Sequence, residues 1–95
     1  MANKLKIVHI ASEVAPFSKT GGLGDVTRSL PKALRRLGHE VIIISPFYKQ
    51  VIDTAKHNLQ PVFKNVKVFL NSEDQVEVTY WKGYLMEDLP IYFVE

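Results

Sequence analysis

The 95-residue sequence predicts an α/β fold, in which a β-hairpin is inserted into a parallel sheet. Residues 5–45 run from an apolar stretch through an amphipathic stretch to a second apolar stretch, which is the order of a strand–helix–strand unit. After Pro61 the apolar pattern changes to a period of two, which is typical of antiparallel strands. A further apolar run at residues 90–95 predicts one more strand.

Two strands and a short helix follow from local composition. Residues 5–11, LKIVHIA, are almost continuously apolar and predict a parallel strand that is buried on both faces. Residues 40–45, EVIIIS, predict a second strand of the same kind, which Pro46 ends. Residues 51–57 predict a short helix.

The longest helix is predicted between these two strands. Its apolar residues recur at steps of three and four, as in an amphipathic helix: Leu23, Val26, Leu30, Leu34 and Leu37. Arg35 and Arg36 suit the negative end of the helix dipole, and Gly38 suits the left-handed position that ends a helix. Pro31 lies inside the pattern, so we expect a kink or a divided helix there.

The second half of the chain predicts a hairpin and a last strand. Residues 62–70 and 75–83 alternate in polarity on either side of a polar turn at residues 71–74. The strand at residues 90–95 has no helix after it to cover its face, whereas parallel strands are covered on both sides. We therefore expect one partial domain, residues 1–95, cut from a longer protein.

Composition and charge limit the partners. The formal charge of +2 is small and the basic residues are scattered, so we expect no nucleic acid partner. Because no apolar run reaches the roughly 20 residues of a membrane span, we expect no membrane partner either. The absence of cysteine excludes disulfides and thiolate metal sites, and it indicates a reducing compartment.

The segment SKTGGLGDV, residues 18–26, predicts an anion site at the start of the long helix. Gly21 and Gly22 would let backbone N–H groups approach an oxyanion, the helix dipole would add positive potential, and Lys19 could supply a mobile charge to a phosphate. The alternative is a simple turn and glycine cap, with Asp25 complementing the dipole. Spacing alone does not separate the two interpretations.

Two familiar phosphate motifs are excluded. A P-loop needs its lysine after the glycines, whereas Lys19 precedes them. A dinucleotide fingerprint needs a glycine where the chain has Thr27, and an acid near the end of the second strand, where it has Ser45 and Pro46. A nicotinamide-dependent oxidoreductase is therefore not favoured.

Residues 11–48, ASEVAPFSKTGGLGDVTRSLPKALRRLGHEVIIISPFY, closely resemble the start of bacterial glycogen synthases and plant starch synthases. The Lys-Thr-Gly-Gly element is highly specific to that family, and the Leu-Pro containing Pro31 is also a family feature. The resemblance implies a Rossmann-like N-terminal domain of a two-Rossmann-domain (GT-B type) retaining glycosyltransferase, whose C-terminal nucleotide-binding domain is absent from this chain.

The resemblance also implies a reaction and its partners. Such an enzyme transfers glucose from ADP-glucose to the non-reducing end of an α-1,4-glucan, with no metal and no other cofactor, in the bacterial cytoplasm or the plastid stroma. Because the rest of the catalytic machinery lies beyond residue 95, the chain alone is expected to be inactive. The alternative is a non-catalytic carbohydrate- or phosphate-binding module derived from the same family.

Carried over by position, the resemblance implies ADP-glucose-binding residues but no catalytic residue within the chain. These are Lys19 for the donor phosphates, Gly21 and Gly22 through their N–H groups, and Thr20, Asp25 and Glu13 near the cleft. Asp25 and Glu13 could instead cap the helix or brace the loop.

The remaining conspicuous side chains are interpreted as structural. His9 fits a packed strand histidine, and neither His39 nor His57 has a metal-ligand partner at useful spacing. Tyr80 and Trp81 fit hairpin packing better than a glucan surface. The hairpin turn explains Glu73 and Asp74 without catalysis.

Overall fold

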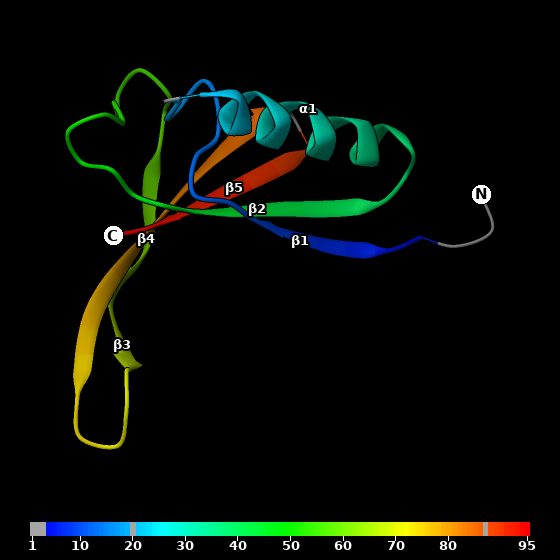
Figure 1. The fold of residues 1–95 in the computed structure, drawn as a ribbon. Coiled ribbons are helices and arrows are strands. Elements are labelled where there is room, and N and C mark those ends of the chain that lie inside the picture. Colours follow the sequence, from blue (N-terminus) through cyan, green and yellow to red (C-terminus); the bar gives the residue numbers. More distant parts are fainter. Residues whose placement is uncertain (1–3, 20, 87) are drawn as a thin grey trace.

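The computed structural model describes residues 4–19, 21–86 and 88–95 as one five-stranded sheet with one long helix on it (Figure 1). The elements in chain order are β1 (Lys6–Ile10), α1 (Gly22–Arg36), β2 (Glu40–Pro46), β3 (Gln60–Phe69), β4 (Gln75–Met86) and β5 (Leu89–Val94). The strand order is β1-β2-β5-β4-β3, with β1, β2 and β5 parallel and β4 antiparallel to both of its neighbours. The predicted α/β fold with a parallel part and a hairpin is confirmed, and the sheet as a whole is mixed, with two parallel and two antiparallel pairings.

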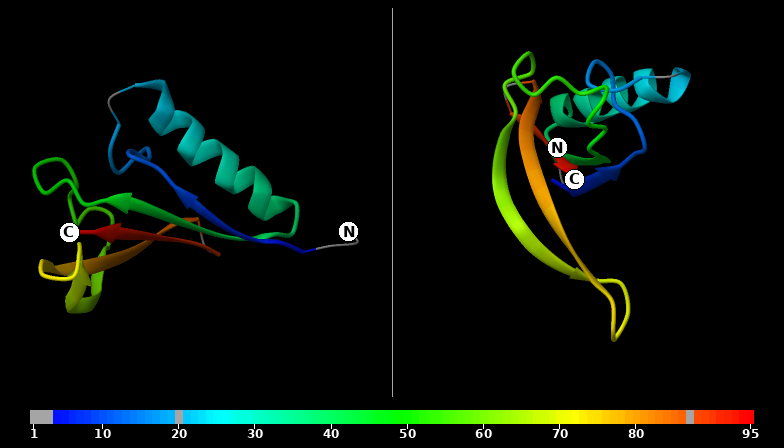
Figure 2. Two further views of the ribbon diagram at one scale, coloured as in Figure 1. Left: turned by 60° about the horizontal axis from the view of Figure 1, so that its bottom comes forward. Right: turned by 90° about the vertical axis from the view of Figure 1, so that its left-hand side faces the viewer.

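Helix α1 covers one face of the parallel part of the sheet, as the two further views show (Figure 2). The core lies between them and includes Val41, Ile43, Ile91 and Phe93, all at most 2% exposed. These residues alternate along β2 and β5 because successive side chains of a strand point to opposite faces. The hairpin of β3 and β4 projects from the body (Figure 1).

The prediction that the first two strands are buried on both faces is wrong for this chain. Burial alternates in both, and on the face away from α1 Val8 and Ile10 are 55% and 75% exposed. Strand β1 stands at an edge of the sheet, and in the described part of the chain only one face carries a helix. Ile42 and Ile44 are half-buried on that same open face.

Helix α1 is continuous across Pro31, so of the two predicted outcomes, a kink or a divided helix, the divided helix is wrong. Its buried side consists of small or compact residues, Gly24, Thr27 and Pro31. Most residues of the predicted apolar stripe are exposed, each of the first three standing one position before a buried residue in the sequence. The exposed members are Leu23, Val26, Leu30 and Leu37. Only Leu34 of that stripe packs against the core.

The predicted end of α1 is confirmed. Leu37 is the C-cap, and Gly38 has φ +97°, the left-handed conformation that glycine adopts without steric cost. Its N–H donates to the carbonyl of Arg35 at 3.0 Å. The chain then turns directly into β2.

The predicted helix at residues 51–57 is wrong, because these residues form turns. The Oδ1 atom of Asp53 accepts hydrogen bonds from the backbone N–H groups of Ala55 and Lys56, at 3.1 and 3.0 Å. Asn58 follows with φ +55°, a conformation that does not continue a helix. One backbone bond of helical spacing forms, from the N–H of His57 to the carbonyl of Asp53 at 3.2 Å, but it is not continued, and side-chain bonding to the local backbone holds the turns.

The hairpin prediction is confirmed, including its polar turn. Val66 pairs with Val78 and Val68 with Val76 across the two strands. At the tip, Oδ1 of Asn71 accepts the backbone N–H groups of residues 73 and 74, both at 2.8 Å. The turn is thus held by its own side chains, as in an Asx turn.

Gly83 of β4 is a glycine whose replacement we expect to destabilise the fold by overpacking the core. A Cβ atom at this position would overlap Cδ2 of Leu59, which is 4% exposed and packed in the core. Gly83→Ala is therefore expected to lower the free energy of unfolding by about 1–3 kcal/mol, as overpacking typically does. Gly22→Ala is the control, because its Cβ would meet nothing within 4 Å. Thermal or denaturant unfolding measures both, and equal stability of the two variants would contradict the prediction.

Candidate functional site

The candidate site lies at the carboxyl ends of the parallel strands, where ligands bind in open α/β sheets. It is formed by the lysine loop, residues 11–19 between β1 and α1, and by the segment that follows β2. The loop begins on the sheet, because the N–H of Ala11 donates to the carbonyl of Ile44 at 3.0 Å. Thr20 falls outside the described residues.

The lysine loop is closed on itself and anchored in the core. The N–H of Ser18 donates to the carbonyl of Val14 at 2.8 Å, and the N–H of Val14 donates to the Ser18 hydroxyl at 3.2 Å. The side chain of Val14 is fully buried, and the ring of Phe17 meets the rings of His57 and Phe93 with centroids 4.7 and 5.2 Å apart. The side chain of Lys19 therefore extends from a loop whose backbone is held in place.

Glu13 joins the lysine loop to the first turn of α1. Its side chain is 8% exposed, and Oε1 accepts the N–H of Gly24, the third residue of the helix, at 2.9 Å. The first amides of a helix have no partner within it, so this carboxylate satisfies one of them and complements the dipole. Of the two predicted roles of Glu13, the structure thus shows bracing, and a ligand contact stays a prediction.

Two further hydrogen bonds, one from a side chain and one from the backbone, reinforce this junction. The Thr27 hydroxyl, on a residue only 1% exposed, donates to the carbonyl of Glu13 at 2.5 Å. The N–H of Ala15 donates to the carbonyl of Gly24 at 3.1 Å. The buried side of α1 is narrow here, at Gly24 and Thr27, and this lets the loop backbone approach the helix.

Lys19 lies along the first turn of α1, beside Asp25. The Nζ atom of Lys19 is 3.0 Å from Oδ2 of Asp25, and the two side chains are 49% and 58% exposed. The lysine stem packs over Gly24, where an added Cβ would be only 3.1 Å from Cγ of Lys19. An exposed ion pair contributes at most about 1 kcal/mol, so an anionic ligand can replace Asp25 as the partner of Lys19.

Gly21 and Gly22 leave open space at the start of α1. Gly21 is the N-cap residue in an extended conformation, and Gly22 is the first helical residue. A Cβ at either position would meet nothing within 4 Å. The helix thus begins at an open surface near Lys19, as an anion site at a helix N-terminus requires.

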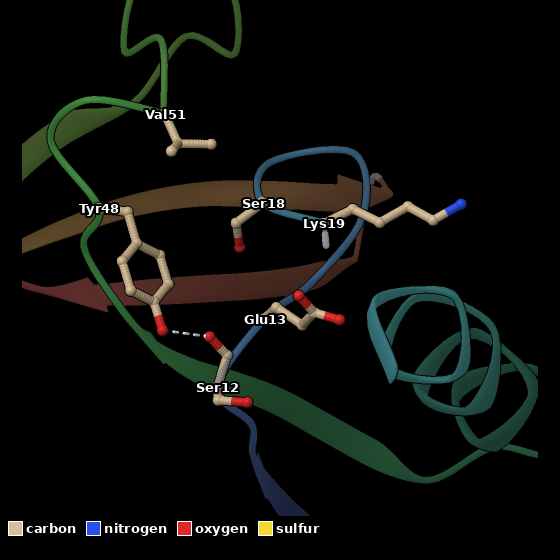
Figure 3. A pocket seen from close by; sticks show the side chains of 6 residues that line it. All are labelled: Ser12, Glu13, Ser18, Lys19, Tyr48 and Val51. Carbon is tan, nitrogen blue, oxygen red and sulfur yellow. Dashed lines mark hydrogen bonds between the residues drawn. The ribbon is translucent and has the colours of Figure 1, made fainter. Parts of the chain in front are cut away.

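A pocket of about 240 Å³ separates the lysine loop from the segment after β2 (Figure 3). It is lined by Ser12, Glu13, Ser18, Lys19, Tyr48 and Val51. The Tyr48 hydroxyl donates to the carbonyl of Ser12 at 2.6 Å across it. The sequence analysis did not select Tyr48. Its position in the sequence could have indicated it. Tyr48 follows the predicted second strand, which ends at Pro46, and the carboxyl ends of adjacent parallel strands meet at one edge of the sheet.

The other conspicuous side chains make packing contacts. Nδ1 of His39 accepts the N–H of Leu5 at 3.1 Å. The Trp81 ring stacks on Phe47 with centroids 5.2 Å apart, and its Nε1 donates to Glu95 at 2.9 Å. That hydrogen bond, together with the ion pair between Lys49 and Glu95, holds the pKa of the Glu95 carboxyl below its usual value.

Among the described residues no group of three histidine, cysteine or acidic side chains could hold a metal ion. No helix in this part of the chain is long and apolar enough to span a membrane.

Comparison with known proteins yields consistent matches. A family model described as the starch synthase catalytic domain matches residues 6–95. Glycogen synthase 2 of Geobacter sulfurreducens is 43% identical over 95 residues, 96% of this chain and 18% of the relative. Granule-bound starch synthase 2 of Solanum tuberosum, described as chloroplastic/amyloplastic, is 41% identical over 83 residues, 87% of this chain and 10% of the relative.

A solved structure matches as well. It is the catalytic domain of Starch Synthase IV from Arabidopsis thaliana bound to ADP and acarbose. The TM-score is 0.83 at 38% identity, over 98% of this chain and 18% of that chain. The present chain therefore spans about a fifth or less of the length of these relatives.

Thr27→Val tests the junction between the lysine loop and α1. The change keeps the side-chain shape but leaves the buried carbonyl of Glu13 without the Thr27 hydroxyl, so we expect a loss of about 1–3 kcal/mol in the free energy of unfolding. Thr79→Val on β4, where the side chain is half-buried, is the matched control and should change stability much less. Denaturant unfolding of both variants measures the difference. Equal losses would show that the Thr27 hydroxyl does not stabilise the junction.

Proposed function

Since the chain belongs to the starch synthase catalytic domain family, we propose that it is the N-terminal part of a glycogen or starch synthase. The whole enzyme would transfer glucose from ADP-glucose to the non-reducing end of an α-1,4-glucan with retention of configuration. The observation that carries this proposal is the position of Lys19 beside the glycine N-terminus of α1. The Arabidopsis relative bound to ADP and acarbose supports a nucleotide and a carbohydrate as ligands.

We assign the donor phosphates to the start of α1. Lys19 would exchange its exposed partner Asp25 for a phosphate oxygen, while the amides at Gly21 and Gly22 and the helix dipole face the same anion. As the glycosidic bond breaks, negative charge develops on the departing ADP. Fixed donors already aimed at that charge lower the barrier, because they need no reorganisation during the reaction.

The remaining requirements follow from the same assignment. Positive charge for the diphosphate would come from Lys19 and the helix terminus, so we propose that neither a metal nor another cofactor takes part. The other domain of the full-length chain would supply the remaining nucleotide contacts and the catalytic groups. The compartment would be the bacterial cytoplasm or, in a plant, the plastid stroma, and neither nucleic acid nor membrane would be a partner.

Lys19→Ala in the full-length enzyme tests the donor site. Loss of a charge-assisted contact to phosphate is expected to lower kcat/KM for ADP-glucose by roughly 10- to 100-fold. Lys64→Ala, an exposed lysine on the projecting strand β3, is the charge-matched control and should leave kcat/KM unchanged. Steady-state kinetics with varied ADP-glucose measures both. Unaltered kinetics of Lys19→Ala would refute the assignment.

The 95-residue chain by itself is expected to transfer no glucose, because the proposed catalytic groups lie in the rest of the protein. Incorporation of labelled glucose from ADP-glucose into glycogen is the assay, with the full-length protein as the positive control. Transfer by the short chain would contradict this expectation. Absence of transfer by the full-length protein would instead favour a non-catalytic binding module.

A further inference from the structure

We propose that Tyr48 is a positioning residue that holds Lys19 in place for the donor, acting through the backbone of Ser12. This inference rests on the proposed function of the lysine loop. Bonds from α1 fix one side of that loop, at Glu13 and Ala15. On the other side, the Tyr48 hydroxyl donates to the Ser12 carbonyl at 2.6 Å, joining residues 36 positions apart (Figure 3).

Tyr48 is itself held firmly enough to act as an anchor. It stands two residues beyond the end of β2, where the N–H of Phe47 donates to the carbonyl of Val94 at 2.9 Å. The carbonyl of Tyr48 accepts the N–H groups of Val51 and Ile52 at 3.0 and 2.8 Å. Both sides of this residue in the chain are thus fixed to neighbouring backbone.

Ser12 transmits the restraint to the helix terminus. It lies between Ala11, which is bonded to β2, and Glu13, whose carboxylate caps Gly24 and whose carbonyl accepts the Thr27 hydroxyl. A shift of the Ser12 carbonyl would therefore tilt Glu13 relative to α1. The stem of Lys19 packs over Gly24, which lies in the first turn of α1. Lys19 would therefore move when Glu13 shifts relative to that turn.

Because the Tyr48 hydrogen bond is exposed, its loss is expected to affect the position of the lysine loop more than the stability of the fold. The Tyr48 side chain is 36% exposed and its hydroxyl bond lies at the surface, so water can replace it at the Ser12 carbonyl. Tyr48→Phe keeps the ring that lines the pocket and removes only the hydroxyl. The variant should therefore fold normally and hold the loop less tightly.

The experiment uses the full-length enzyme and the Tyr48→Phe variant. We expect KM for ADP-glucose to rise about two- to tenfold, the range set by one hydrogen bond. We expect kcat to fall by a similar or smaller factor, because Lys19 also faces the charge that develops on the departing ADP, and KM for glycogen and the unfolding midpoint to stay nearly unchanged. Titration with ADP should show the same loss of affinity. Tyr80→Phe on β4, whose ring contacts Phe63 in the hairpin, is the matched control and should change none of these values. An unchanged KM, or a large drop in the unfolding midpoint, would overturn the proposal.

A double variant shows whether Tyr48 acts through the lysine. If it does, Tyr48→Phe should have little further effect on ADP-glucose KM in the Lys19→Ala background, because the group being positioned is gone. A full additional rise would place the action of Tyr48 elsewhere and overturn the inference. If Lys19→Ala alone leaves the kinetics unaltered, the donor assignment fails first and the inference fails with it. A null result for Tyr48→Phe beside a strong effect of Lys19→Ala overturns the inference alone.

Discussion

The site depends on one interaction, the buried contact between the carboxylate of Glu13 and the third amide of α1. A carboxylate with so little exposure is costly unless it is hydrogen-bonded, and the free amides of a helix terminus are suitable donors. This contact ties the start of the lysine loop, three residues after β1, to the first turn of α1. The loop core at Val14 and Phe17 can then pack on the sheet, and Lys19 reaches the first turn of α1.

The Lys19–Asp25 ion pair orients the lysine ammonium along the first turn of α1. Because both side chains are about half exposed, water screens the pair and the cost of breaking it is small. A diphosphate carries more negative charge than one carboxylate and can be reached by the helix amides as well. The arrangement therefore keeps the lysine oriented without holding it too tightly for exchange.

Local patterns predicted the elements better than their environments. The strand–helix–strand unit, the C-terminal Gly38 and the hairpin turn follow from periodicity and backbone preference, which are local properties. The buried side of α1 does not follow from local periodicity. The lysine loop packs closely on the helix, and this buries Gly24 and Thr27 and leaves the neighbouring leucine stripe exposed. At the site, the glycines and Lys19 were predicted from a continuous motif. The contact of Tyr48 with Ser12 joins distant segments, which only the register of β1 and β2 brings together.

The strand order has a consequence for how the protein is made. Strand β5 follows β1 to β4 in sequence, yet it lies in the middle of the sheet, between β2 and β4. A ribosome that has released only the residues before β5 has produced one parallel pair and one hairpin with no strand to join them. The core residues Ile91 and Phe93 belong to β5. Before β5 is synthesised, the β1–β2 pair and the β3–β4 hairpin are therefore not joined, and each has an unpaired strand edge. Until β5 is in place, the edges of β2 and β4 that it pairs with are open, and open strand edges are the sites where chains associate wrongly.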